Sequence, residues 1–72
     1  MTLDQANVGD QLTITAIRNE QTATIAVRLG IAEGETVRVS SKVPGGPVVI
    51  CRGRTEIALG RDLCRDIEVT RA

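Results

Sequence analysis

The stretch Val48-Val49-Ile50-Cys51-Arg52-Gly53-Arg54-Thr55-Glu56-Ile57-Ala58-Leu59 decides the fold of this 72-residue chain. Gly53-Arg54 matches a two-residue type II′ hairpin loop, in which glycine takes the first loop position. That loop sets the register, so Cys51 pairs with Glu56 and Val49 pairs with Ala58. One face of the hairpin then carries only large aliphatic residues, which we predict as core: Val48, Ile50, Ile57 and Leu59.

Alternating apolar and polar residues predict three further strands around this hairpin, at 10–16, 36–43 and 66–71. The segment 60–64 has the pattern of a single helical turn. Five short strands with tight turns indicate one all-β domain over 1–72, a small closed barrel of five to six strands with one or two short helices. The apolar members of the three alternating patterns are Leu12, Ile14, Ala16, Val37, Val39, Ile67 and Val69.

The segment 21–29 is open to two interpretations. Its threonine, isoleucine and valine content favours a strand. Its end favours a helix, because Gly30 is suited to the left-handed position that ends a helix in a Schellman motif. In that motif Ile31 would contact Ala26. We predict a short helix here, and this helix either covers the outer face of the hairpin or leaves that face exposed.

The composition excludes several functions. Nine basic residues balance nine acidic ones, whereas binding to a phosphate backbone needs a concentrated positive field. The chain has no histidine and no aromatic residue, so general acid–base catalysis lacks its usual side chain. Base stacking and aromatic grooves for proline-rich peptides are equally excluded. We therefore expect neither an enzyme nor a nucleic-acid-binding protein.

The chain shows no membrane-spanning run and no signal peptide, so we expect a cytoplasmic protein that is not itself embedded in a membrane. In that compartment Cys51 and Cys64 are expected to be thiols. Cys64 is predicted to be a buried packing residue.

The order of motifs resembles the ferrous iron transport protein A (FeoA) family. The resemblance is carried by Leu29-Gly30-Ile31, Gly34, Val37-Arg38-Val39, Gly45-Gly46-Pro47, Ile57-Ala58-Leu59 and Ile67-Glu68-Val69. It implies an SH3-like barrel in the bacterial cytoplasm that associates with the ferrous iron permease, whose cytosolic part is a GTPase domain. The resemblance supplies no catalytic motif. A similar domain forms the C-terminal part of iron-dependent repressors, but this chain has no room for their DNA-binding helix-turn-helix.

Two groups of residues are candidate binding sites. Cys51 and Glu56, opposite each other on the outer face, could hold a divalent metal, although no close CxxC spacing and no histidine complete a ligand set. The neighbouring Val49 and Ala58 form an exposed apolar group typical of a contact surface. The loop Pro44-Gly45-Gly46-Pro47 is a candidate docking tip, because its prolines limit the entropy lost on binding.

Four arginines provide a further candidate surface. We expect them to gather near one end of the barrel, where they would meet an acidic partner or pair with Asp62 and Asp66. The four residues are Arg52, Arg54, Arg61 and Arg65.

Two functional hypotheses follow. The first is a regulatory or assembly subunit of ferrous iron uptake that binds the permease and shifts its conformational population. The second is a metal-responsive module in which Cys51 or Cys64, together with a carboxylate such as Glu56 opposite Cys51, binds a divalent metal and changes the oligomeric state. Neither hypothesis requires a cofactor beyond that possible divalent metal.

Overall fold

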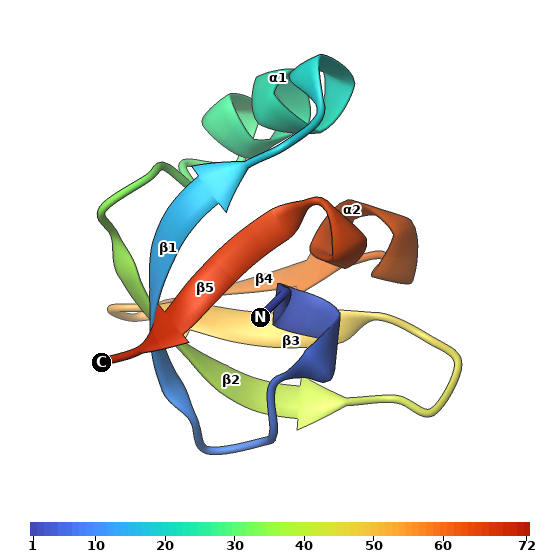
Figure 1. Cartoon of the computed structure of the whole chain (residues 1–72). Helices are drawn as coiled ribbons and strands as arrows, with labels where there is room; N and C mark the ends of the chain where they lie inside the picture. Colours follow the sequence, from blue (N-terminus) through green and yellow to red (C-terminus); the bar gives the residue numbers. More distant parts are fainter.

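The computed structural model describes all 72 residues and contains one five-stranded antiparallel sheet with short helical segments (Figure 1). The fold class predicted from the sequence, all-β with two short helices, is confirmed. In chain order the elements are η1 (Leu3–Gln5), β1 (Gln11–Ile17), α1 (Glu20–Arg28), β2 (Thr36–Lys42), β3 (Val48–Arg52), β4 (Thr55–Leu59), α2 (Arg61–Arg65) and β5 (Ile67–Arg71).

The strands follow the order β4-β3-β2-β1-β5, and the sheet curls so that β5 passes in front of β3 and β4 in Figure 1. No hydrogen-bonded pairing joins β4 to β5, so the closed barrel expected from the sequence stays open at this seam. The free edge of β5 is instead taken by the N-terminus. The amide of Val69 donates to the Met1 carbonyl at 2.8 Å, and Thr2 forms a bridge with Glu68.

The core lies inside the curled sheet and consists of fifteen buried hydrophobic residues. The hairpin register predicted from Gly53-Arg54 is confirmed at all five pairs, from Arg52 with Thr55 to Val48 with Leu59. The four aliphatic residues predicted to face inward are all buried. They are Val48, Ile50, Ile57 and Leu59.

The first strand departs from the strict alternation predicted for it. The pairing of β1 with β5 shifts register between Ile14 and Ala16, which is the mark of a β-bulge. Beyond the bulge both Ala16 and Ile17 are half-buried, and it is Ile17, not Ala16, that packs against the core cluster. Alternation in the sequence continues through this point, and only the pairing with β5 reveals the extra residue.

The helix predicted at 21–29 is confirmed as α1. Asn19 caps its N-terminus by accepting hydrogen bonds from the amides of Gln21 and Thr22. At the C-terminus Gly30 has φ +76°, and the amide of Ile31 donates to the Ala26 carbonyl at 2.8 Å, which completes the Schellman motif. The helix packs against β1 and lies beyond the end of that strand (Figure 1).

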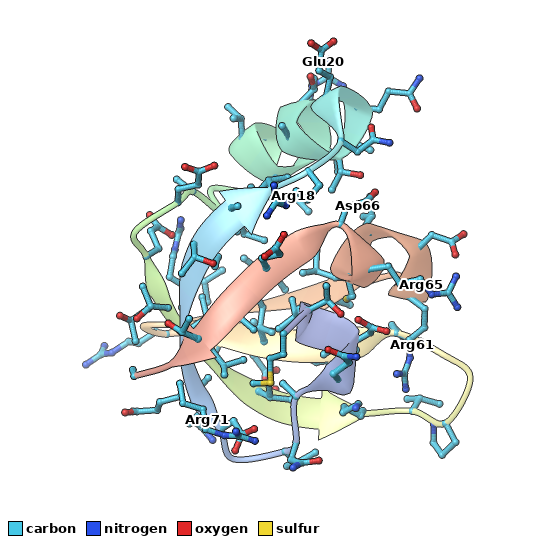
Figure 2. All side chains as sticks on the ribbon, in the orientation of Figure 1. Arg18, Glu20, Arg61, Arg65, Asp66 and Arg71 are labelled. Carbon is cyan, nitrogen blue, oxygen red and sulfur yellow. The ribbon has the colours of Figure 1, made fainter.

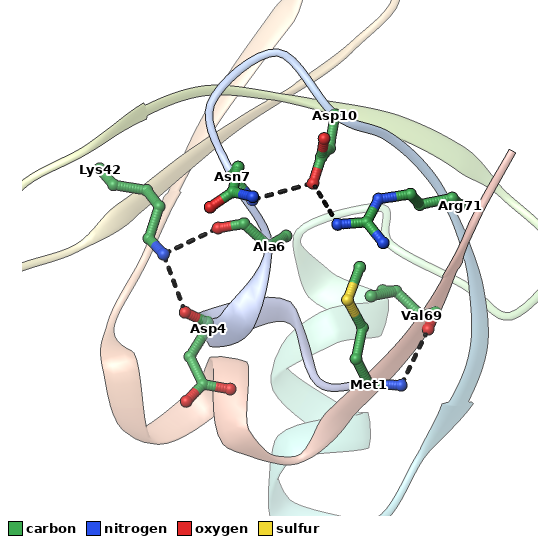
Figure 3. A network of polar contacts seen from close by, with 8 residues as sticks. All are labelled: Met1, Asp4, Ala6, Asn7, Asp10, Lys42, Val69 and Arg71. Atoms are coloured by element: carbon green, nitrogen blue, oxygen red, sulfur yellow. Dashed lines mark hydrogen bonds and ion pairs between the residues drawn. The ribbon is translucent and has the colours of Figure 1, made fainter.

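Polar contacts hold the N-terminal segment against strands on both sides (Figure 3). The Nζ atom of Lys42, at the end of β2, donates to the carbonyls of Asp4 at 2.9 Å and Ala6 at 2.7 Å. On the other side, the N-terminal amino group donates to the Val69 carbonyl of β5 at 3.3 Å. The segment therefore links β2 to β5 and closes one end of the core.

Candidate functional site

Four predicted site residues share one exposed surface, here called the outer hairpin face: Val49, Cys51, Glu56 and Ala58. Their side chains point away from the core because they alternate with the buried aliphatic residues along β3 and β4. Val49 and Cys51 are half-buried, while Glu56 and Ala58 are exposed. Because α1 packs against β1, it leaves this face uncovered, which decides between the two possibilities left open by the sequence.

The structure brings Cys51 and Glu56 together as a cross-strand pair. The Sγ atom of Cys51 lies 3.7 Å from Oε2 of Glu56, and the guanidinium of Arg38 approaches the same sulfur at 3.9 Å. The pair therefore offers two adjacent ligands, one of which also faces a cation. No group of three or more histidine, cysteine, aspartate or glutamate side chains in the chain could hold a metal ion.

The loop predicted as a docking tip, Pro44–Pro47, begins with a type II turn. The amide of Gly46 donates to the Val43 carbonyl at 2.8 Å, and Gly45 has φ +70°, a conformation that favours glycine. Arg61 of α2 holds this loop in place. Its Nε donates to the Gly46 carbonyl at 2.7 Å and its Nη2 donates to the Val43 carbonyl at 3.1 Å.

The loop lies at the end of the hairpin where the outer hairpin face carries Val49 and Ala58. The pair Val49–Ala58 is next to the pair Val48–Leu59, from which the chain continues directly into the loop on one side and α2 on the other. A shallow groove separates loop from helix, lined by residues 45–47, 60–63 and Arg65. At its margin the side chain of Val43 is 50% exposed. The predicted partner-binding residues of the loop therefore adjoin the Val49–Ala58 end of the outer hairpin face.

The four arginines expected at one end of the barrel are separated instead. Arg52 precedes the hairpin loop and Arg54 lies within it, whereas Arg61 and Arg65 lie on α2, at the far end of β4. A five-residue strand spans about 17 Å, which keeps the two pairs apart. Figure 2 shows Arg61 and Arg65 together at the α2 end. Both are engaged within the chain, because Arg61 binds loop carbonyls and Arg65 pairs with Asp62 at 3.0 Å.

Cys64 is buried, as predicted, and its thiol donates to the Leu59 carbonyl at 3.8 Å. Burial in the core raises the pKa of this thiol from 9.0 to about 11, because the thiolate would lose its hydration. The neighbouring Asp4 carboxylate raises it further. Cys64 is therefore a protonated packing residue and takes no part in the candidate site.

Sequence reasoning missed a second apolar surface, on the flanks of α1. The side chains of Ile25, Val27 and Leu29 are 39%, 74% and 37% exposed. The signal was present in the sequence, because the segment 21–27 contains no charged residue, which is unusual for a helix with a solvent-facing side. This surface lies beyond β1 and is not continuous with the outer hairpin face.

A comparison with protein families gives a match over nearly the whole chain. The model of the FeoA domain matches residues 1–71. No curated protein sequence matches the chain.

Several solved structures share the fold. An iron uptake regulatory protein (FeoA) superposes with a TM-score of 0.90 at 25% identity, covering 100% of this chain and 97% of that one. The iron(II) transport protein A of Clostridium thermocellum gives 0.89 at 24% identity, covering 100% and 46%. A manganese-dependent transcriptional repressor gives 0.91 at 20% identity, with 100% of this chain covering 41% of that chain.

Proposed function

This chain belongs to the FeoA domain family and has its SH3-like fold, and we propose that it is an accessory subunit that binds the cytosolic GTPase domain of a ferrous iron permease. Membership of the family implies a role in ferrous iron transport. The observation that carries the proposal is the family match over residues 1–71, together with a solved FeoA protein of nearly the same length.

The chemistry of the chain supports a role through contact. Neither α1 nor α2 has the length and the apolar character that a membrane-spanning helix needs. The chain also has no histidine. The thiol of Cys64 is buried, and its raised pKa keeps it protonated, which disfavours nucleophilic catalysis by this residue. Binding that favours one state of the GTPase domain would shift the population of that state.

We assign the contact to the outer hairpin face and the adjoining loop. Ala58 is exposed and Val49 is half-buried, and both lie on a rigid hairpin whose register is held by five residue pairs. The Pro44–Pro47 loop is preorganised by its turn and by Arg61, so docking would order few additional groups. The protein would work in the cytoplasm, where the GTPase domain lies.

The test is an affinity measurement with the purified GTPase domain of the permease, without nucleotide, with GDP and with a non-hydrolysable GTP analogue. We expect binding in at least one state. Ala58→Arg should weaken it about tenfold or more, since a long cation would replace a small apolar contact. Thr24→Arg, on the exposed side of α1, is the matched control and should bind as the unmodified chain does. Absence of binding in all three states would contradict the proposal.

The adjacency of Cys51 and Glu56 favours a second candidate function, a metal-responsive module. Two ligands from each of two copies would supply four donors, enough for a tetrahedral site. Zinc or ferrous iron added to the purified protein should then produce a dimer with half an equivalent of metal per chain. Cys51→Ser should lose both the metal and the dimer, and an unchanged monomer with excess metal would rule this function out.

A further inference from the structure

The strand β4 forms a free edge of the sheet, and its outward backbone groups have no partner. The two-residue loop makes Arg52 and Thr55 a hydrogen-bonded pair. Every second residue of β4, counted from Thr55, therefore directs its amide and carbonyl toward β3, which includes Ile57 and Leu59. The amides and carbonyls of Glu56 and Ala58 therefore point away from β3. Neither residue takes part in any turn, loop or cap hydrogen bond of the backbone.

This edge lacks most of the features that normally prevent strands from adding to a sheet. Its pairing with β3 has no bulge, and residues 55–59 include no proline and no lysine. Glu56 is the one charged residue on the strand. The opposite edge, on β5, is protected, because the Met1 backbone exchanges hydrogen bonds with Val69. The β5 edge is thus covered by backbone hydrogen bonds, whereas the β4 edge is not.

We propose that β4 receives an extended segment of a partner protein as a sixth, antiparallel strand, with an apolar side chain opposite Ala58 and a basic one opposite Glu56. The inference rests on the proposed function, because it describes how that contact is made. Backbone pairing along an open edge supplies the affinity, while alternate side chains supply the specificity. The partner segment would read apolar-x-basic in its own direction, since an antiparallel strand passes Ala58 before Glu56.

The side chains of the outer hairpin face define this preference. Arg38, Cys51 and Glu56 form one row across β2, β3 and β4, so a basic residue on the added strand continues the row with a cation beside the carboxylate. The neighbouring row ends in Val49 and Ala58. The short Ala58 side chain leaves room for a larger apolar residue to lie over it and reach Val49.

A second copy of this chain fits the edge less well. Antiparallel pairing of two β4 strands about Ile57 would place Glu56 opposite Ala58 of the other copy, so the added strand would bring no cation opposite the carboxylate. The two Glu56 carboxylates would become diagonal neighbours and repel each other. Charge therefore favours a basic partner segment over self-association.

The test is an NMR titration of the ¹⁵N-labelled full chain with blocked heptapeptides. The probe is acetyl-TTVTKTT-amide, and its matched control is acetyl-TTVTETT-amide. We expect the first peptide to shift the amide signals of Glu56 and Ala58 and to slow their hydrogen exchange. The second should bind about fivefold more weakly, because the cross-strand charge pair changes from attraction to repulsion. Signals confined to other strands, or no shift at all, would overturn the proposal.

Variants separate backbone pairing from side-chain contact. Ala58→Pro removes the outward amide without touching a bond to β3, and it should abolish binding of the first peptide while the spectrum stays dispersed. Ala58→Val keeps the amide and should bind at least as well as the unmodified chain. Shifts at Glu56 and Ala58 that appear on concentrating the protein without peptide would identify a second copy as the occupant and overturn the proposal.

The Ala58→Pro variant also distinguishes this inference from the proposed function. If the GTPase domain binds Ala58→Pro as tightly as the unmodified chain, the accessory function stands and strand addition is wrong. If the domain binds no form of the chain, the proposed partner is wrong, and the peptide titration still decides whether β4 accepts a strand.

Discussion

The two edges of the sheet show how this small protein separates stability from binding. At the β5 edge, the N-terminus pairs with the strand, and Arg18, just after β1, forms an ion pair with Glu68 of β5. At the β4 edge, a straight five-residue strand meets solvent with its outward amides unpaired. A domain of this size buries little surface on folding, so the pairing of the N-terminus with β5 adds to its stability. The β4 edge has no such pairing and stays open for contact with a partner.

Paired proline substitutions should show the largest difference between the edges. The Val69 amide points to Met1, so the next amide along β5, that of Thr70, points to β1. Thr70→Pro removes that ladder bond and should cost about 3 kcal/mol of unfolding free energy, whereas Ala58→Pro should cost about 1 kcal/mol or less. Urea denaturation of the two variants measures both costs. Equal losses would show that the β4 edge is as integral to the fold as the β5 edge.

The buried thiol between the two edge strands should make the fold sensitive to alkali. The pKa of Cys64 is raised to about 11 in the folded chain, so above pH 9 the unfolded chain ionises while the folded chain does not. The contribution of this thiol to the free energy of unfolding should therefore be fully present below pH 9, and the free energy should fall by about 2 kcal/mol between pH 9 and 11.

Urea denaturation at pH 7, 9 and 10.5 measures this decline. Cys64→Ala is the control, because it lowers stability at every pH through lost packing but removes the contribution of this thiol to the slope. Identical slopes for the two proteins would contradict the prediction and place the thiol outside the cooperative core.

The smallest effect is expected at the exposed ion pair of the β5 edge. The hydrogen bond from Arg18 lowers the pKa of Glu68, so the pair stabilises the fold above the ordinary pKa of a glutamate and loses this effect as the pH falls through the lowered value. Glu68→Gln should reduce stability slightly at pH 7 and low salt, and not at all in about 1 M salt. Thermal unfolding in both buffers checks this. A large loss would mean that the pair helps to hold the edge closed.

Local sequence signals predicted the parts of the fold that local geometry controls. Gly53 in the hairpin loop set the register, and Gly30 set the end of α1, because each needs a positive φ that few other residues adopt. The bulge in β1 was not predictable from the alternating pattern. It depends on how β1 meets β5, a strand about fifty residues away along the chain.

The cross-strand pairs of the candidate site were predictable from the sequence, whereas the positions and contacts of the neighbouring arginines were not. The register brought Cys51 opposite Glu56 and Val49 opposite Ala58, as expected. The role of Arg61 in holding the loop was missed, since no sequence pattern shows which carbonyls a long side chain will reach. The expected cluster of four arginines was wrong for a related reason, because positions close in sequence lie at opposite ends of a strand.

The sequence by itself determined the strands, the hairpin register and which residues of the hairpin face inward, because side-chain alternation and glycine conformation act over a few residues. The tertiary structure alone decided that the sheet stays open between β4 and β5, that the N-terminus covers one edge, and that the outer hairpin face remains uncovered. These features depend on which distant segments compete for the same backbone hydrogen bonds, and a linear pattern carries no record of that competition.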